Sequence, residues 1–476
     1  MKRIGLQRAV AVQTSSMPTS SQVVSIQKKL IKAGVEYVLA AFVDVHGNSK
    51  AKCVPIGKFG ELCEGKELYT VGACEGMGLV GPQEDECNTV PDLGHIVQFP
   101  WDKRFAWMPA DCYRYGKPHW GDGRVILQRV MNKARGMGFE FDLGIEPEFY
   151  VFRKNKESGA LEPLAPIGYK GPNACYDVRQ TLGSMDFLDP MCRYIEHLGW
   201  GVHSFDQECG KGQFEFDFHY TNALTMSDRL IFLRLMAREV AKSLGAIATF
   251  MPKPFANDFR SGAHFNMSLA DVKTGRNVFL PGRKPDEWAG KYGINASRLC
   301  LNFVAGLLKH APALTAVCCP TFNSYKGLIA QGDLADMSWA PVLRCYGKNN
   351  RSAMLRLPMS RPCVENRAVD MSVNPYLAAA LSLAAGLEGI EKDMDPGEPL
   401  NDNLYSLSKK ETDRKRVERL PQTLLDALRA FEADPLVTEA FGAEFAEVYY
   451  EQKYKEWTKG FYKVHEEERA EMLTQL

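Results

Sequence analysis

Two glutamates stand two residues apart in a stretch that has the composition of a β-strand. Glu146 and Glu148 flank Pro147 within residues 139–152, a run of aromatic and β-branched residues. Residues two apart on a strand point to the same face, so the two carboxylates are expected side by side, where they repel unless a cation or a shared proton neutralises them. Because proline donates no ladder hydrogen bond, we predict a strand edge or strand end here. An isolated pair is more often two solvated glutamates, so the interpretation depends on further acidic motifs.

A second pair of glutamates lies on either side of a glycine-containing turn. Glu208 and Glu215 are separated by Gly210 and Gly212. A spacing of seven would place the two carboxylates on opposite faces of one straight strand, and the glycines disfavour a helix. The arrangement consistent with both observations is a strand, a tight turn and a second strand, with both glutamates facing one cavity.

Polar side chains also alternate with apolar ones in residues 261–269. His264, Asn266 and Ser268 would share one face of a strand. A lone histidine in such a place is more often a hydrogen-bonded structural residue than a ligand. Three polar side chains on one strand face favour a functional site over a purely structural role.

Arginines gather further along the chain, within residues 350–367. Arg351, Arg356, Arg361 and Arg367 accompany Glu365 in this stretch. On strands, they would turn their guanidinium groups into a cleft, an arrangement that suits phosphate and carboxylate recognition. Ordinary surface ion pairing is the alternative interpretation.

Five glutamates and a histidine facing arginines indicate a specific chemistry. Mg²⁺ and Mn²⁺ prefer oxygen ligands with an occasional imidazole, and cations with arginines are the recurring parts of phosphoryl transfer. The sequence contains no Walker loop, kinase glycine-rich loop or dinucleotide fingerprint, so a nucleotide would be held in another way. The residues alone therefore predict a metal-dependent phosphoryl-transfer enzyme.

Composition limits the class of protein. The 476 residues suggest two domains, and 58 Lys and Arg balance 58 Asp and Glu, which gives no sign of a nucleic-acid or membrane partner. Thirteen cysteines without a CxxC pair suit reduced thiols in a cytoplasmic enzyme. The basic, serine-containing start of the chain, before Glu36, is interpreted as a flexible tail, with a targeting peptide as the alternative.

Hydrophobic periodicity and turn residues predict the elements that position these side chains. We expect helices at 21–33, 125–135, 226–244 and 301–317, strands at 35–43, 96–99 and 105–108, a domain boundary near 117–118, and helices from residue 377 onward. Asp44 stands at the corner of a hairpin whose second strand extends to Val54, where an aspartate usually just caps the turn.

Together, these motifs resemble the glutamine synthetase superfamily over nearly the whole chain. The segments that carry the resemblance are Glu146-Pro-Glu148, Glu208 to Glu215, Lys253-Pro254, Ser261 to Ser268, Asn323-Ser-Tyr-Lys326, Asn350-Arg-Ser-Ala353, Glu365-Asn-Arg367 and Asn374-Pro-Tyr-Leu377. The resemblance implies an α+β fold: a tail (1–20), a small N-terminal β-grasp domain (21–117) and a catalytic domain (118–476) with a curved antiparallel sheet and flanking helices.

The resemblance also implies roles for residues. One metal would be held by Glu148, Glu208 and Glu215, and a second by Glu146, His264 and Glu365, with ATP and two or more Mg²⁺ or Mn²⁺ ions at each site. Tyr220, Asn266, Ser268 and Arg356 would lie near the nucleotide. His264, Arg351 and Arg367 would contact the substrates, and Asp44, Arg351, Arg356 and Glu365 would take part in catalysis.

The implied assembly is a homo-oligomer of stacked rings, usually a dodecamer of two hexamers. Asp44 would reach the active site of a neighbouring subunit and help to deprotonate the incoming ammonium. The implied reaction has two steps: the side-chain carboxylate of glutamate attacks the terminal phosphate of ATP, and an amine then displaces phosphate from the acyl phosphate.

The sequence departs from the family pattern in ways that bear on the substrates. Gly327 stands where a substrate-binding arginine is usual, and residues 258–261 replace a glycine-rich stretch. Trp339 precedes Ala-Pro where the family usually has a glutamate in the ammonium pocket, which favours a larger, less polar amine. Cys363 occupies the neighbourhood of a common arginine, for which Arg361 is a candidate replacement, and Tyr405 resembles a residue of the adenylylation loop.

The Trp-Ala-Pro segment resembles the type III and γ-glutamylmethylamide synthetase-like branch. We therefore expect an ATP-dependent ligase that joins a glutamate-like acid to a small amine. An ammonium-dependent glutamine synthetase is the enzymatic alternative, and a non-catalytic scaffold or sensor is the alternative of another class. The sequence alone chooses neither the amine nor the acid.

Overall fold

The computed structural model describes residues 19–79, 81–164, 175–284, 286–328 and 339–472. The predicted tail therefore lies almost wholly outside the described residues. The first elements in chain order are α1 (Ser20–Lys32), β1 (Tyr37–Val43), β2 (Ser49–Lys50), β3 (Val54–Pro55), α2 (Phe59–Cys63), β4 (Leu68–Tyr69), β5 (Cys87–Pro91), β6 (Val97–Gln98), β7 (Phe105–Arg114) and β8 (Lys117–Pro118).

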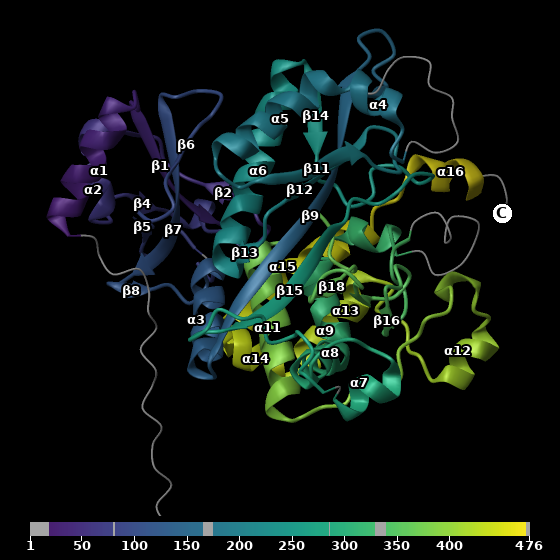
Figure 1. Cartoon of the computed structure of the whole chain (residues 1–476). Coiled ribbons are helices and arrows are strands. Elements are labelled where there is room, and N and C mark those ends of the chain that lie inside the picture. The colour runs from purple at the N-terminus through teal and green to yellow at the C-terminus, as the bar shows by residue number, and fades with distance from the viewer. Residues whose placement is uncertain (1–18, 80, 165–174, 285, 329–338, 473–476) are drawn as a thin grey trace, which may run out of the picture.

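These strands form the first of two sheets, seen in purple and blue in Figure 1. Its main path runs β2-β1-β7-β5-β4, with β1 and β7 parallel and the other pairs antiparallel. The predicted hairpin is present, although its second strand is broken into β2 and β3, both of which pair with β1. Asp44 lies directly after β1 at the corner of this hairpin.

The strands of the second sheet bring the predicted site residues together. They are β9 (Phe139–Lys154), β10 (Leu161–Pro163), β11 (Val202–Gln207), β12 (Gln213–Phe218), β13 (Thr221–Asn222), β14 (Ala246–Thr249), β15 (Ala263–Asp271), β16 (Tyr346–Lys348), β17 (Leu355–Leu357) and β18 (Val364–Asn366). The order is β11-β12-β9-β15-β18-β17-β16, antiparallel except for β16 and β17. Long strands β9 and β15 cross the middle of Figure 1. The predicted α+β fold class is confirmed.

The prediction that Pro147 marks a strand edge or end is wrong. Pro147 lies inside the 16-residue strand β9, opposite Ala263 of β15. On the other side of β9, pairing with β12 ends at Glu148 and pairing with β13 begins at Leu143. Backbone donors alternate between the two neighbours of an antiparallel strand, and Glu148 donates to Gly262 on the β15 side. The nitrogen of Pro147 therefore faces the gap between β12 and β13, where no donor is required.

Helices follow the first sheet in the chain, and some of them pack against the second sheet. They are α3 (Gly123–Gly136), α4 (Val178–Gly183), α5 (Met185–His197), α6 (Ala223–Ser243), α7 (Glu287–Tyr292), α8 (Arg298–Lys309), α9 (Ala311–Cys318), α11 (Pro375–Glu391), α12 (Lys409–Lys415), α13 (Leu424–Ala433), α14 (Pro435–Phe441), α15 (Ala443–Phe461) and α16 (Glu466–Met472). Helices α3 and α6 pack against β9 of the second sheet. Helix α11 is buried along most of its length and packs against α8 and α3.

The single buried helix predicted at 301–317 is in fact two helices. Helices α8 and α9 meet at His310 with a bend of 77°. Pro312 lies in the first turn of α9, where proline is tolerated because the first helical N–H groups need no partner within the helix. Within the described ranges, no single helix has the length and apolar character to cross a membrane, and only this bent pair passes such a test jointly.

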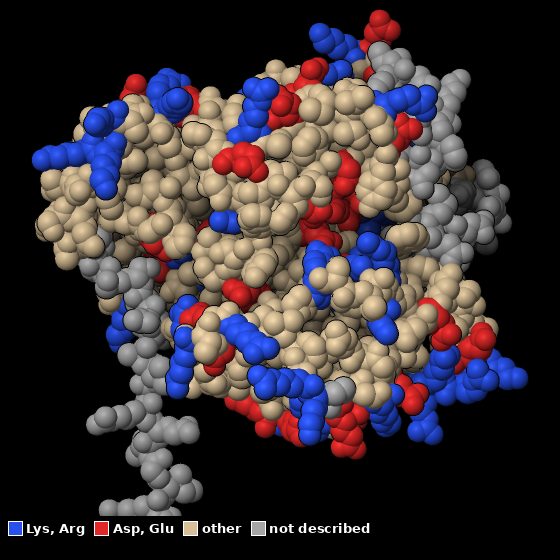
Figure 2. Space-filling view, in the orientation of Figure 1, with Lys and Arg blue, Asp and Glu red and all other residues tan. Residues whose placement is uncertain are grey.

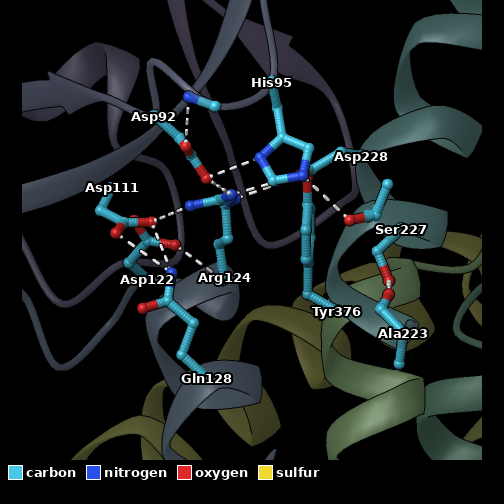
Figure 3. Close-up of polar contacts among 12 residues, drawn as sticks. Asp92, His95, Asp111, Asp122, Arg124, Gln128, Ala223, Ser227, Asp228 and Tyr376 are labelled. Carbon is cyan, nitrogen blue, oxygen red and sulfur yellow. Dashed lines mark hydrogen bonds and ion pairs between the residues drawn. The ribbon is translucent and has the colours of Figure 1, made fainter. Parts of the chain in front are cut away.

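A buried charge network joins the two sheets (Figure 3). Arg124, at the start of α3, is 3% exposed and forms ion pairs with Asp92, Asp111 and Asp228. Asp111 lies on β7 of the first sheet, and Asp92 directly follows β5 of the same sheet. Asp228 lies on α6, beneath the second sheet. The three carboxylates satisfy the buried guanidinium on each of its nitrogens.

Candidate active site

Strand register places the predicted ligands opposite one another. Glu146 of β9 is the direct partner of His264 on β15, and Glu148 of β9 is the partner of Glu215 on β12. Directly paired residues on antiparallel strands have Cβ atoms about 5 Å apart. The strands thus bring both glutamates of β9 to one side, each with a predicted ligand beside it.

One cluster consists of Glu146, His264 and Glu365. One ligand atom from each side chain lies within 4.8 Å of the others. The Nδ1 atom of His264 is 3.3 Å from Glu146 Oε2 and 4.0 Å from Glu365 Oε1, and Glu148 Oε1 is 3.6 Å away. Two carboxylates and an imidazole at this spacing are a suitable donor set for Mn²⁺ or Mg²⁺.

The second cluster contains Glu148, Glu208 and Glu215. The predicted strand–turn–strand is confirmed: β11 and β12 are antiparallel, and Glu208 directly follows β11. Burial and then the charge of Glu148 raise the pKa of Glu208, and the same two causes raise the pKa of Glu215 well above its ordinary value. In the described part of the chain, neither Glu208 nor Glu215 forms an ion pair with a basic side chain. A bound divalent cation would supply the missing positive charge, so Glu148, Glu208 and Glu215 are suited to bind a metal ion.

Gly262 permits the close approach between these two clusters. A Cβ atom at this position would lie 2.8 Å from His264 Nε2 and 2.9 Å from Glu148 Oε1. The Gly262 N–H also donates to Glu148 Oε2 at 2.8 Å, and Gln213 Nε2 donates to the same oxygen at 3.0 Å. The orientation of Glu148 is therefore fixed by the protein itself.

Arginines form the opposite wall. Glu365 is fully buried and accepts from Arg356 through one oxygen and from Arg367 through the other, both at 2.6 Å. Burial alone would raise the pKa of Glu365, but the neighbouring cations, Arg367 foremost, hold that pKa below its ordinary value. Arg361 Nη1 is 3.0 Å from Glu146 Oε1, so Arg361 does reach the candidate metal cluster.

Except for Glu365, which is buried behind Arg356 and Arg367, these side chains surround one cavity of about 680 Å³. Figure 2 shows acidic side chains in a hollow near the middle of this face, with basic side chains beside them. Its lining includes Glu146, Glu148, Glu208, Glu215, His264, Trp339, Arg351, Arg356, Arg361 and Arg367. Strands β9, β12, β15 and β17 and several of the connecting loops therefore contribute to one acidic and basic pocket.

Other predicted site residues lie away from this lining. Asn266 contacts the cluster indirectly, because its Nδ2 donates to Glu146 Oε1 at 3.0 Å, and Ser268 is buried further along β15. Tyr220 is 65% exposed and packs over Gly144 of β9. Asp44 is 1% exposed, and its Oδ1 accepts from the backbone N–H groups of its own turn.

Comparison with known proteins agrees with this geometry. The model of the catalytic domain of glutamine synthetase matches residues 120–472. The chain belongs to the glutamine synthetase family. The superfamily resemblance predicted from the motifs is confirmed.

Related members of the glutamine synthetase family include two kinds of ligase. A glutamate–methylamine ligase from Methyloversatilis universalis is 38% identical over 433 residues, which cover 91% of this chain and 95% of that protein. A glutamine synthetase from Rhizobium leguminosarum bv. phaseoli is 34% identical over 431 residues, 89% of this chain and 93% of that one. A solved GmaS/ADP complex superposes with a TM-score of 0.85 at 32% identity, covering 94% of this chain and 99% of that chain.

Gly327 stands where the glutamine synthetase family pattern led us to expect an arginine, and the structure shows what fills the space. The aliphatic part of Arg260 packs over Gly327, so a Cβ at position 327 would lie 3.1 Å from Arg260 Cβ. Arg260 is 5% exposed and donates through Nη2 to the carbonyl oxygens of Ala368 and Val369. These carbonyls follow Arg367, so Arg260 supports the segment that carries Glu365 and Arg367.

Trp339 and Tyr405 together line a second, smaller pocket, and Trp339 also lines the cavity described above. Trp339 is half-exposed, has a left-handed φ of 45° and follows residues 329–338, which are outside the described residues. The hydroxyl of Tyr405 donates to the carbonyl oxygen of Ala340 at 3.0 Å. The predicted adenylylation-like residue therefore contacts the Trp-Ala-Pro segment directly.

Sequence reasoning missed several cavity residues. Asp206 and Asp217 line it, and burial followed by the charge of Glu208 raises the pKa of Asp206 to about 7. Both follow the alternation that identified Glu208 and Glu215. Asp217 is two residues after Glu215, and Asp206 is the cross-strand partner of Glu215. Cys175 and Tyr176 also line the cavity, and no motif identified them.

Proposed function

We propose that this protein is an ATP-dependent ligase that joins the γ-carboxylate of glutamate to methylamine and forms γ-glutamylmethylamide. The observation that carries the proposal is the cavity in which the Glu146–His264–Glu365 cluster faces Arg351, Arg356 and Arg367. The relative named glutamate–methylamine ligase and the GmaS structures, which match over nearly all of their length, support the choice of amine.

Two groups of side chains are suited to hold Mg²⁺ or Mn²⁺. Glu146, His264 and Glu365 would hold one ion, and Glu148, Glu208 and Glu215 would hold another. When bound, such ions neutralise phosphate oxygens of ATP during transfer of the terminal phosphoryl group. Asn266 acts through Glu146, since its amide orients that carboxylate.

The arginines of the chain bind and orient the anionic substrates. Glu365 fixes the guanidinium groups of Arg356 and Arg367, so these cations are preorganised before a phosphate or carboxylate arrives. Arg351 lines the same cavity, and within the described ranges it forms no ion pair, which leaves its charge for the substrate. Tyr220 and Ser268 are proposed to contact the nucleotide, although neither lines the cavity of a single chain.

The amine would bind beside Trp339. This side chain lines the cavity and stands where family members with ammonium as substrate carry a glutamate. An indole ring offers an alkyl group apolar contact and gives ammonium no carboxylate. An alkylamine therefore gains contacts in this pocket that ammonium lacks.

We also propose that the protein assembles into stacked hexameric rings in the cytoplasm. In such a ring, the turn that carries Asp44 would reach the cavity of the neighbouring copy and help to deprotonate the amine. None of the thirteen cysteines, all of which lie in the described part of the chain, forms a disulfide, as suits a reducing compartment.

The decisive experiment measures phosphate release from MgATP and glutamate with methylamine, ethylamine or ammonium as acceptor. We expect methylamine to give the highest kcat/KM. Glu146→Gln should lose activity, whereas the control Glu140→Gln, also on β9 but outside the cavity lining, should retain it. A preference for ammonium would instead favour glutamine synthesis, the activity named for the Rhizobium relative. Absence of turnover with bound metal would favour a non-catalytic sensor.

A further inference from the structure

Two thiols and a carboxylate converge on one side of the cavity. Cys175, Glu208 and Cys209 each offer a ligand atom, and these atoms lie within 4.8 Å of one another. All three side chains are half-buried and line the cavity. The two thiols are close enough to hydrogen-bond to each other. Neither cysteine has a role in the proposed ligase reaction.

The backbone holds the three residues in place. Tyr176 N–H donates to the Gln207 carbonyl oxygen at 2.9 Å, which ties the segment carrying Cys175 to the end of β11. Cys209 N–H donates to Glu208 Oε2 at 2.8 Å. The buried amide of Gln207 donates to the carbonyl oxygens of Glu208, Gly210 and Gln213, and so fixes the turn that contains Cys209. The three ligands of the cluster therefore lie on backbone that is held by hydrogen bonds before an ion binds.

The donor set selects a class of metal. Thiolates prefer thiophilic cations such as Zn²⁺, whereas Mg²⁺ prefers oxygen ligands only. Zn²⁺ binds sulfur at about 2.3 Å in tetrahedral sites, which places ligand atoms roughly 3 to 4 Å apart. We infer that Cys175, Glu208 and Cys209 form a site for Zn²⁺ or a similar thiophilic cation, beside the proposed Mg²⁺ position. Binding forms two Zn–S bonds and one Zn–O bond and releases the two thiol protons to solvent, with a water as fourth ligand.

Occupancy of this site inhibits the ligase. Glu208 belongs both to this cluster and to the proposed Glu148–Glu208–Glu215 metal set, and it has one carboxylate to offer. Zn²⁺ therefore withdraws Glu208 from Mg²⁺, and the inhibition is relieved by excess Mg²⁺. This regulatory consequence depends on the proposed function, whereas the binding site itself does not.

Cobalt binding tests the site without any assay of activity. Co²⁺ bound to thiolate shows sulfur-to-metal charge-transfer absorption in the near-ultraviolet, which oxygen and imidazole ligands do not give. Titration of the reduced full-length protein should give this absorption with one equivalent of Co²⁺ per chain, displaced by Zn²⁺. Cys175→Ser and Cys209→Ser should each lose it, and the control Cys192→Ser, on α5 outside the cavity lining, should keep it. Absence of the absorption, or its persistence in both serine variants, would overturn the inference.

Inhibition is then measured against each variant's own activity without Zn²⁺. The Zn²⁺ concentration for half inhibition should rise roughly tenfold or more in Cys209→Ser and should also rise with Mg²⁺ concentration in the wild type. Equal inhibition in wild type and both variants would place Zn²⁺ at the glutamate clusters instead. Recovery with a thiol reductant but not with a chelator would identify a Cys175–Cys209 disulfide and contradict the metal site.

Discussion

The aliphatic chain of Arg260 lies against Gly327, so close that a side chain on residue 327 would require Arg260 to shift by a few tenths of an ångström. A Cβ there would meet Arg260 Cβ at 3.1 Å and Cδ at 3.3 Å. The φ of Gly327 is −93°, so backbone strain does not require glycine at this position. The tight contact is therefore with the Arg260 side chain, and we expect the two positions to be energetically coupled.

This coupling predicts the outcome of a double-mutant cycle. Gly327→Arg should lower kcat/KM for glutamate strongly, because the new side chain displaces Arg260 and disturbs the carbonyls that follow Arg367. Combined with Arg260→Gly, the same change should be less damaging, with a coupling energy of about 1 to 3 kcal/mol. Steady-state kinetics and thermal unfolding of the four proteins would measure it. If the effects of the two single substitutions simply added up in the double variant, the contact between Arg260 and Gly327 would have no functional importance.

The Arg124 network predicts where the fold depends on a buried charge. Arg124→Met should reduce the free energy of unfolding by about 3 to 5 kcal/mol, because Asp92, Asp111 and Asp228 would remain buried without their cation. Arg135→Met is the matched control on the same helix, since Arg135 forms an exposed pair with Glu140 and should cost within about 1 kcal/mol. Urea unfolding monitored by circular dichroism would compare them. Equal losses of unfolding free energy in the two variants would contradict the view that the fold depends on the buried charge of Arg124.

His310 predicts a pH-dependent contribution to stability. Its ring is 4% exposed and lies between Glu388 and Asp434, at 2.5 and 2.6 Å. Burial opposes protonation, but hydrogen bonds to Asp434 and Glu388 raise the pKa of His310 above its usual value of 6.5. A raised folded-state pKa gives stability that is fully present below the unfolded pKa and is lost as pH rises through the folded pKa.

The loss of stability in His310→Gln should therefore be largest near about pH 6 and smaller near about pH 9. Lys309 and Lys392 also pair with Glu388 and stay charged over this range, so they do not produce the difference. His197→Gln, on the exposed end of α5, is the control and should show no such trend. The midpoints of urea unfolding of the wild type and both variants, measured at the two pH values, would test this trend. A constant difference would show that His310 does not change protonation there.

Period-two alternation and glycine turns located most of the site in the sequence. Glu208 and Glu215 were placed on one cavity because Gly210 and Gly212 allow the tight turn between their strands. The same alternation would have identified Asp206 and Asp217. The prediction of a strand edge at Pro147 is wrong because the strands that flank β9 come from distant parts of the chain. The gap between β12 and β13, which the nitrogen of Pro147 faces, cannot be recognised in the local sequence.

Other features depend on contacts between distant residues. His310, at the break between α8 and α9, pairs with Asp434, 124 residues away, and a helical pattern does not show this contact. Cys175 reaches Glu208 because Tyr176 bonds to the end of β11. The packing of Arg260 over Gly327 likewise joins two loops that are 67 positions apart, so the contact cannot be read from the local sequence.

The proposed sharing of active sites between copies predicts complementation. Asp44→Asn and Glu146→Gln should each inactivate a homo-oligomer, the first by removing a proposed base and the second by weakening a metal site. Asparagine can keep the turn, because both backbone N–H groups of the turn donate to Oδ1 of Asp44. When the two variants are co-expressed in equal amounts, roughly a quarter of the shared sites would combine a native Asp44 with a native Glu146.

Recovered phosphate release in the purified mixed oligomer would therefore show that Asp44 acts across a subunit boundary. A mixture of Glu146→Gln with Glu365→Gln is the control, because both residues belong to the ligand cluster of one chain and every site would keep one defect. That mixture should stay inactive. If the Asp44→Asn mixture is equally inactive while its subunits do exchange, then Asp44 serves only its own chain, as the burial of its carboxylate within the hairpin turn would explain.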